Sequence, residues 1–254
     1  MFTTPLRKLS NYPKPLMMIK FFRKIRYNLM EQNKTGKYLK YAIGEIILVV
    51  IGILIALQIN NWNEARKSKA FETEILTQIQ ANLIKDKLTL QDISSNFQKA
   101  IASSNKILES TWTDQDKDSL KYWLGDVIQF DRFQPLTNAY EVLKSKGLDQ
   151  VQNKQLRFLL GTYYDDEAKR SIESIKDVEE VFKNDWVPIM QKEVDDAKFK
   201  SFIKPKDIRL FTEESLAKNI LKINRDNFNG GKNRINQTII TIDKIQEIIT
   251  KELN

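Results

Sequence analysis

The chain has 254 residues and contains neither cysteine nor histidine. Those absences exclude a Ser-His-Asp triad, a cysteine nucleophile, a histidine general base and a zinc site built from thiolates or imidazoles. Residues 1–45 carry the whole net charge of +8, with ten Lys or Arg against two Glu, so the rest of the chain is neutral. We therefore expect no nucleic-acid partner, because that remainder has no excess positive charge for a phosphate backbone.

The first forty residues are predicted to form two segments. Residues 1–17 contain three prolines and no hydrophobic periodicity, so we expect a disordered leader. Residues 18–40 read as a basic amphipathic cytoplasmic segment, with apolar and basic residues on opposite helical faces. We predict that it lies on the membrane surface, with a cytoplasmic docking helix as the alternative. The expected surface contacts are Lys20, Arg23, Lys24 and Arg26.

Residues 41–62 are predicted to form a transmembrane helix. Ten of the twelve residues from Ile46 to Leu57 are Ile, Leu or Val. As a helix, residues 41–59 span about 28 Å, close to the bilayer's hydrocarbon thickness of about 30 Å. A core helix would show a polar stripe, and a cleaved signal peptide would have a shorter leader and a small-residue cleavage site. An uncleaved signal anchor is therefore the favoured interpretation.

The charges beside this helix predict its orientation. Seven basic residues and one acidic residue lie between Met18 and Lys40, whereas the charges that follow Trp62 are balanced. The positive-inside rule then places the N-terminus in the cytoplasm and the remaining chain on the other side of the membrane.

One face of the apolar helix carries small residues at every fourth position. The pair Gly52 and Ala56 would permit close approach of a second helix, in a homodimer or with a membrane-protein partner. Because small residues are common in membrane spans, the alternative is that this face has no role. The predicted helix-packing seam consists of Gly44, Leu48, Gly52 and Ala56.

Residues 63–254 are predicted to form an irregular helical bundle. Apolar residues at spacings of three, four and seven continue the first helix to about Ser110. We expect breaks at residues 111–119, at Gly147, at the connection 196–211 and at residues 229–231. The helices expected between these breaks cover residues 120–130, residues 138–146, Asn153 to Trp186 or Val194, a segment from Thr212, and residues 235–253. The predicted fold class is all-α, with one N-terminal transmembrane helix that continues into this bundle.

Two groups of polar residues are candidate sites. Asp114, Asp116 and Asp118 alternate as in a calcium loop, but the loop's glycine and bidentate glutamate are missing. We expect a solvated linker that caps a helix beginning near Ser119. No motif indicates a metal or a cofactor.

A second group combines tyrosines with carboxylates, at Tyr140-Glu141 and at residues 163–166. These side chains could line a ligand pocket, but aromatic core anchors beside exposed acids are the favoured interpretation. Trp112, Trp123 and Trp186 are also expected in the core.

Two stretches carry a family resemblance. The first is MIKFFRKIRYNLMEQNKTGKYLKYAIGEIILVVIGILIALQINNWNEARK, from Met18, and the shorter second is AYEVLKSKGLDQVQNKQLRFLLGTYYD, from Ala139. Both resemble an uncharacterised family of single-pass membrane proteins found in Bacteroidota. The resemblance implies an inner-membrane protein with a periplasmic domain at residues 63–254. It supplies no catalytic residues.

We expect a scaffold or interaction component of a membrane assembly rather than an enzyme. The expected partners are the lipid bilayer and either a second copy or another membrane protein. The alternative is a sensory module whose periplasmic bundle binds a ligand and relays the signal to a cytoplasmic partner.

Overall fold

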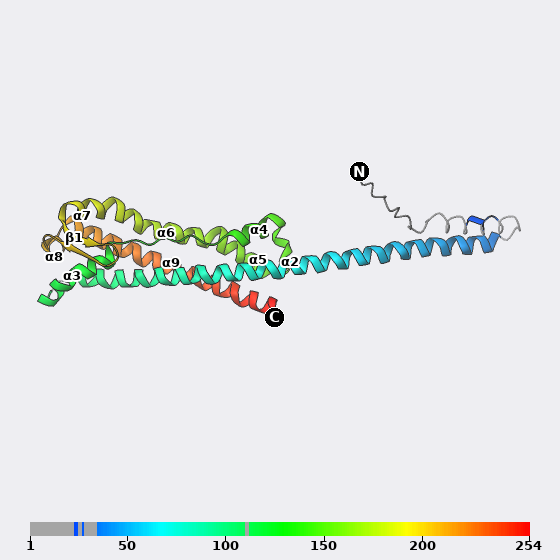
Figure 1. The fold of residues 1–254 in the computed structure, drawn as a ribbon, viewed down its shortest axis with the longest axis horizontal. Helices are drawn as coiled ribbons and strands as arrows, with labels where there is room; N and C mark the ends of the chain where they lie inside the picture. Colours follow the sequence, from blue (N-terminus) through cyan, green and yellow to red (C-terminus); the bar gives the residue numbers. More distant parts are fainter. Residues whose placement is uncertain (1–22, 25–26, 28–34, 110–111) are drawn as a thin grey trace, which may run out of the picture. The chain divides into compact units, whose positions relative to one another are not determined.

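The computed structural model describes residues 23–24, 27, 35–109 and 112–254. The chain divides into two compact units, Met1–Lys67 and Ser68–Asn254. Apart from one two-stranded hairpin and short connections, the described residues are helical (Figure 1), which confirms the predicted all-α class. The predicted disordered leader and the predicted surface contacts Lys20 and Arg26 lie outside the described residues, whereas Arg23 and Lys24 are helical and exposed.

Helix α2 (Thr35–Leu108) is continuous and ends close to the predicted boundary at Ser110. Within the second unit, its buried side chains follow the predicted apolar stripe. Residues spaced by three, four and seven positions share one helical face, and this face is turned into the core. The buried members of the stripe are Leu76, Ile79, Leu83, Leu90, Ile93, Phe97 and Ile101.

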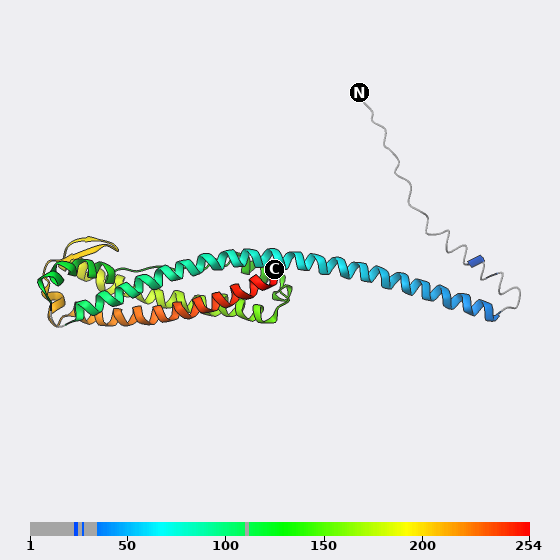
Figure 2. The same cartoon turned by 90° about the horizontal axis from the view of Figure 1, so that it is seen from below.

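Helix α9 (Leu216–Leu253) packs antiparallel against α2 in the second unit (Figures 1 and 2). Side-chain contacts establish the direction, because residue numbers fall along α9 as they rise along α2. The hydrogen-bonded pairs are Gln80 with Thr250, Ser94 with Asn236, Gln98 with Lys232, and Asn105 with Arg225.

The third long element runs without a break from Lys154 to Glu193, which matches the longer of its two predicted extents. Asn153 begins it, with a side-chain oxygen that accepts a hydrogen bond from the Leu156 amide at 3.0 Å. Two turns have π-helical hydrogen bonds, which place one extra residue in each turn. The successive parts are α5 (Lys154–Gly161), η2 (Thr162–Glu167), α6 (Ala168–Val181), η3 (Phe182–Trp186) and α7 (Val187–Glu193).

Two predicted boundaries in the last helix are wrong. The chain does not break at residues 229–231, because Gly230 and Gly231 both continue α9. A Cβ on Gly231 would lie 2.7 Å from the ring of Phe97, so glycine permits close approach of two helices here. The helix also begins later than Thr212. A short helix, α8 (Arg209–Thr212), comes first, and the Ser215 hydroxyl caps α9 by accepting from the Lys218 amide.

The predicted acidic break is also partly wrong. Helix α3 (Asp114–Val127) begins near the first aspartate rather than near Ser119. Thr113 and Asp116 form a reciprocal capping box, so Asp116 serves as a cap for this helix and not as part of a linker. Helix α4 (Asn138–Lys146) has its predicted bounds and ends at Gly147, whose φ of +104° favours glycine. A single 3₁₀ turn, η1 (Leu148–Gln150), follows.

The connection predicted at residues 196–211 contains an antiparallel hairpin that the sequence analysis missed. Its strands are β1 (Val194–Lys198) and β2 (Phe202–Pro205). At the tip, the Phe199 ring packs against those of Phe130 and Phe182. Most β1 side chains are exposed, so the strand lacks the hydrophobic alternation by which a sequence reveals a strand.

An extended segment, residues 129–136, runs back along the bundle from α3 to α4 (Figure 1). Two contacts hold it to the long helices. The Leu136 amide donates to the buried Asp86 carboxylate of α2 at 3.1 Å, and Arg132 forms an ion pair with Glu179 of α6 at 2.6 Å.

Candidate membrane helix and ligand groove

The first candidate site is the apolar part of α2, in the first unit. One helix in the described part of the chain is long and apolar enough to cross a membrane, and no other described residue buries its apolar window. A core helix of a water-soluble domain would be buried, so this helix differs from the stripe that follows it. Exposed apolar side chains surround it on all sides: Tyr41, Ile43, Ile46, Ile47, Leu48, Val49, Val50, Ile51, Ile53, Leu54, Ile55, Leu57, Ile59 and Trp62.

The predicted helix-packing seam lies within this uncovered surface. No described atom lies within 4 Å of a Cβ built on Gly44 or Gly52, so this face has room for a second helix. Leu48 and Ala56 are exposed on the same helix. The homodimer or partner contact at this seam stays a prediction.

The tyrosines singled out in the sequence gather inside the bundle. Tyr140 of α4 stacks on Tyr164 of η2, with ring centroids 4.4 Å apart, and Tyr163 packs edge-on against Tyr164. The Tyr163 hydroxyl donates to buried Asp86 at 2.6 Å, and the Tyr140 hydroxyl donates to Asp165 at 2.7 Å. All three rings are buried, as expected for aromatic core anchors rather than for the walls of an open pocket.

Burial controls the ionisation of this cluster. Desolvation raises the pKa of Asp86, although hydrogen bonds from Tyr163 and the Leu136 amide oppose the shift. Desolvation also raises the pKa of all three tyrosines, with the neighbouring carboxylates adding to the effect. The tyrosines therefore stay protonated, and the hydroxyl groups of Tyr163 and Tyr140 donate hydrogen bonds that join η2 to α2 and to α4.

The predicted tryptophan positions agree with the structure. Trp186 is fully buried, and Trp112 and Trp123 pack partly buried against the core.

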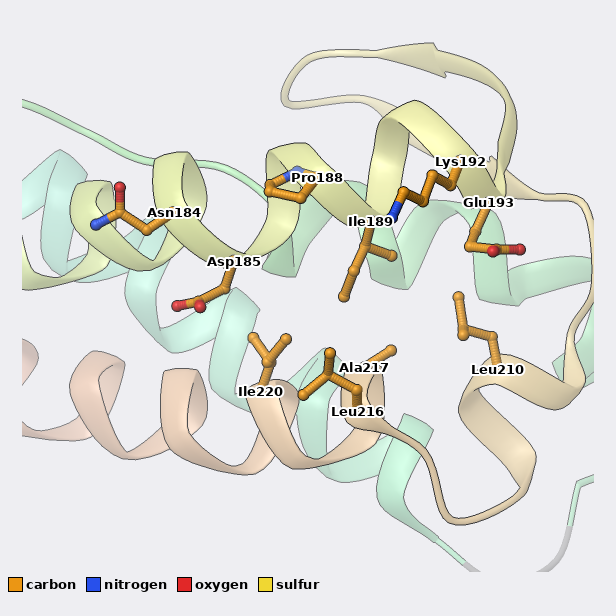
Figure 3. Close-up of a pocket in the computed structure, with 10 residues that line it drawn as sticks. All are labelled: Asn184, Asp185, Pro188, Ile189, Lys192, Glu193, Leu210, Leu216, Ala217 and Ile220. Carbon is orange, nitrogen blue, oxygen red and sulfur yellow. The ribbon is translucent and has the colours of Figure 1, made fainter.

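A groove between α7 and the start of α9 is the second candidate site (Figure 3). Its volume is about 370 Å³, at the lower end of the range of roughly 300–1,000 Å³ for small-molecule sites. In Figure 3, Ile189 and Ile220 point toward one another across the groove, and Leu210 reaches in from α8. The lining residues are Asn184, Asp185, Pro188, Ile189, Lys192, Glu193, Leu210, Leu216, Ala217 and Ile220.

The local backbone explains why the helix has an irregular turn at this groove. Pro188 has no amide hydrogen, so it cannot donate to the Asn184 carbonyl as an α-helix requires. The preceding turn is π-helical instead, with the Val187 amide donating to the Phe182 carbonyl. The groove therefore begins at a widened turn, where the Asn184 carbonyl has lost its usual α-helical donor.

The groove combines apolar walls with charged ends. Asp185 lies at one end, and Lys192 and Glu193 lie toward the other (Figure 3). Within the described part of the chain, none of these three side chains forms an ion pair. Lys206 adds positive charge near the Lys192 end, where its ammonium donates to the Lys192 carbonyl at 2.6 Å.

The sequence analysis did not identify this groove. Pro188 inside a predicted helix is a local signal of a disturbed helical turn. The groove itself depends on Leu210, Leu216 and Ile220, which come from two other helices, and sequence spacing does not reveal that contact.

A smaller groove of about 300 Å³ lies between the extended segment and α6. Its central carboxylate is already paired, because Glu179 forms ion pairs with both Arg132 and Lys183. These contacts lower the pKa of Glu179 to about 2. These ion pairs hold the extended segment against the bundle. They leave less unpaired charge for a ligand than the groove between α7 and α9 offers.

Comparisons with known proteins give a family but no activity. A family of unknown function, DUF6090, matches residues 45–172, which is half of the chain and includes the tyrosine cluster. The groove residues from Asn184 onward lie beyond that match. Neither the curated proteins nor the solved structures give a match. On the extent of the family match, this chain belongs to the family of unknown function DUF6090.

Proposed function

We propose that this chain is a single-pass inner-membrane protein that scaffolds a membrane assembly through its helical bundle. The observation that carries the proposal is the contrast between two parts of α2. No described residue covers the apolar stretch up to Ile59, whereas the apolar stripe after Ser68 is buried in the bundle. A bilayer is the solvent that suits the first part, and water suits the outside of the second.

The topology belongs to this proposal. The basic residues before Tyr41 support a cytoplasmic N-terminus and a periplasmic bundle. The absence of histidine and cysteine from the sequence supports a non-catalytic role. The partner is a second copy or another membrane protein, which contacts the small-residue face of the apolar helix, the bundle, or both.

The anchoring proposal is tested with one arginine at the centre of the span. We expect Val50→Arg to disfavour insertion by about 2.5–3.5 kcal/mol, as read from the membrane-inserted fraction after carbonate extraction. Leu88→Arg is the matched control, because Leu88 is an exposed apolar residue of the same helix within the bundle. Equal membrane-inserted fractions for the two variants would contradict the proposal that this apolar segment anchors the chain in the membrane.

The scaffold proposal is tested with the full chain, tagged at its C-terminus, in native membranes. We expect cross-linking to recover a stoichiometric membrane-protein partner or a homodimer. Protease added to spheroplasts should remove the tag if the bundle is periplasmic. Recovery of the tagged chain as a monomer under conditions that preserve other membrane complexes would contradict the scaffold role.

A second candidate function is ligand binding coupled to a cytoplasmic partner. The groove between α7 and α9 favours it, because the groove has apolar walls and charged side chains that form no ion pair with the described residues. Residues of helix α2 belong to both units, so this helix would transmit the effect of ligand binding to the cytoplasmic partner. Thermal-shift screening of the detergent-solubilised full chain tests this candidate, and the absence of stabilisation across a broad metabolite set would count against it.

A further inference from the structure

The groove between α7 and α9 has Asp185 at one end, Lys192 and Glu193 toward the other, and an apolar middle (Figure 3). At one end lies Asp185, whose carboxylate forms no ion pair with any described residue. This end therefore offers a carboxylate, which carries a negative charge and accepts hydrogen bonds. It suits a ligand's ammonium group.

The other end carries the side chains of Lys192 and Glu193, and Lys206 lies next to Lys192 outside the groove lining. The Lys206 ammonium is fixed by its bond to the Lys192 carbonyl, and the Lys206 amide donates to the Glu193 carbonyl at 2.8 Å. These bonds hold Lys206, the residue that follows strand β2, against the end of α7. This end of the groove suits a ligand's carboxylate.

The separation of the two ends sets the ligand's length. Asp185 and Lys192 are seven positions apart along one helical run, which corresponds to about 10 Å. An extended peptide advances about 3.3–3.6 Å per residue, so about three residues cover this distance. Between the ends, Ile189, Leu210 and Ile220 provide an apolar surface for the ligand's side chains.

We propose that this groove binds a short apolar peptide of about three residues with both termini free. Its ammonium group lies at Asp185, its carboxylate at Lys192, and its side chains on the apolar walls. The proposal deepens the second candidate function and rests on it, because it names the class of ligand. A fatty acid would leave Asp185 unpaired, and a linear diamine would place an ammonium group against Lys192, so the peptide matches both ends better.

The test titrates the tripeptide Leu-Ala-Leu into the full chain held in lipid nanodiscs, with empty nanodiscs as the blank. Three further forms of the same peptide are acetylated at the N-terminus, amidated at the C-terminus, or blocked at both ends. By isothermal titration calorimetry, we expect saturable heat for the free peptide. Each singly blocked form should bind about tenfold more weakly than the free peptide, or weaker still, because each block removes one charge-assisted contact.

Two substitutions assign the ends of the peptide. Asp185→Asn should abolish the preference for a free N-terminus and leave the preference for a free C-terminus, and Lys192→Gln should do the reverse. Both side chains are exposed, so we expect the variants to fold. Asp177→Asn and Lys169→Gln are matched controls on exposed positions of α6, outside the groove, and should bind like the unaltered protein.

The outcomes separate this proposal from the others. No saturable binding of the free peptide, or equal binding of all four forms, would overturn it. Binding that neither groove variant alters would also overturn it, since the peptide would then lie elsewhere. Membrane extraction and cross-linking test the anchoring and scaffold proposals, so the result of this titration does not affect them.

Discussion

Two neighbouring glycines in α9 provide a matched test of how closely the long helices pack. Gly230 is exposed, and no described atom lies within 4 Å of a Cβ added there. Gly231 is buried, and the same added Cβ would lie 2.7 Å from Phe97 Cε2 and 3.5 Å from the Ser174 carbonyl oxygen. Both glycines have ordinary helical backbone angles, since Gly147 is the glycine with positive φ in the described part of the chain.

The expected effects differ in sign. Gly230→Ala should stabilise the protein by about 0.4–1 kcal/mol, because alanine favours the helix and restricts the unfolded chain. Gly231→Ala has the same intrinsic benefit but forces the Phe97 ring to move. That ring is fully buried and packs edge-on against Phe228 at 5.0 Å, so overpacking should cost about 1–3 kcal/mol. The net effect of Gly231→Ala is therefore destabilising, or at best neutral.

The assay is thermal unfolding of the full chain in detergent, followed by circular dichroism at a helical wavelength. For a domain of this size, 1 kcal/mol corresponds to about 2–4 °C in Tm. We expect Gly230→Ala to raise Tm and Gly231→Ala to lower it or leave it unchanged. An equal rise for both variants would refute the close approach of α9 to α2. A fall for both would instead favour the helix break that the sequence alone suggests at residues 229–231.

Three further predictions test ionisation, a buried hydrogen bond and a helix cap. Ion pairs lower the pKa of Glu179 from 4.5 to about 2, so their stabilisation is present above about pH 4.5 and is lost as pH falls toward 2. The Tm difference between the unaltered protein and Glu179→Gln should therefore vanish over that range, and a pH-independent difference would contradict the assignment. Tyr163→Phe removes a donor from a buried carboxylate and should cost about 1–3 kcal/mol in chemical denaturation, whereas Tyr164→Phe removes a hydroxyl with no hydrogen-bond partner among the described residues and should cost much less. Thr113→Ala should cost about 0.5–2 kcal/mol through the lost cap, and Ser119→Ala should not; the reverse order would place the helix start near Ser119.

The sequence was sufficient wherever one strong local signal decides the structure. An uninterrupted apolar run marked the candidate membrane helix, and regular apolar spacing marked the buried face of α2. Asn153 and Gly147 marked the start and the end of helices because caps act within one or two turns.

The sequence failed where a distant contact outweighs a local preference. Residues 229–231 resemble a turn, but the space taken by Phe97 explains why glycine occurs inside an unbroken helix. The hairpin at residues 194–205 depends on its tip packing against Phe130 and Phe182. Short, mostly exposed strands carry too weak a pattern to predict it.

The sequence by itself determined the helical class and the apolar segment that is long enough to cross a membrane, because both follow from patterns among neighbouring residues. Composition alone excluded histidine and cysteine chemistry. Only the tertiary structure decided which side chains meet. It brought Tyr163 to Asp86 across 77 positions, and it formed the groove by placing Leu210, Leu216 and Ile220 opposite α7. Such contacts depend on how whole helices pack, and the spacing of residues along one helix does not encode the identity of the residues that face it.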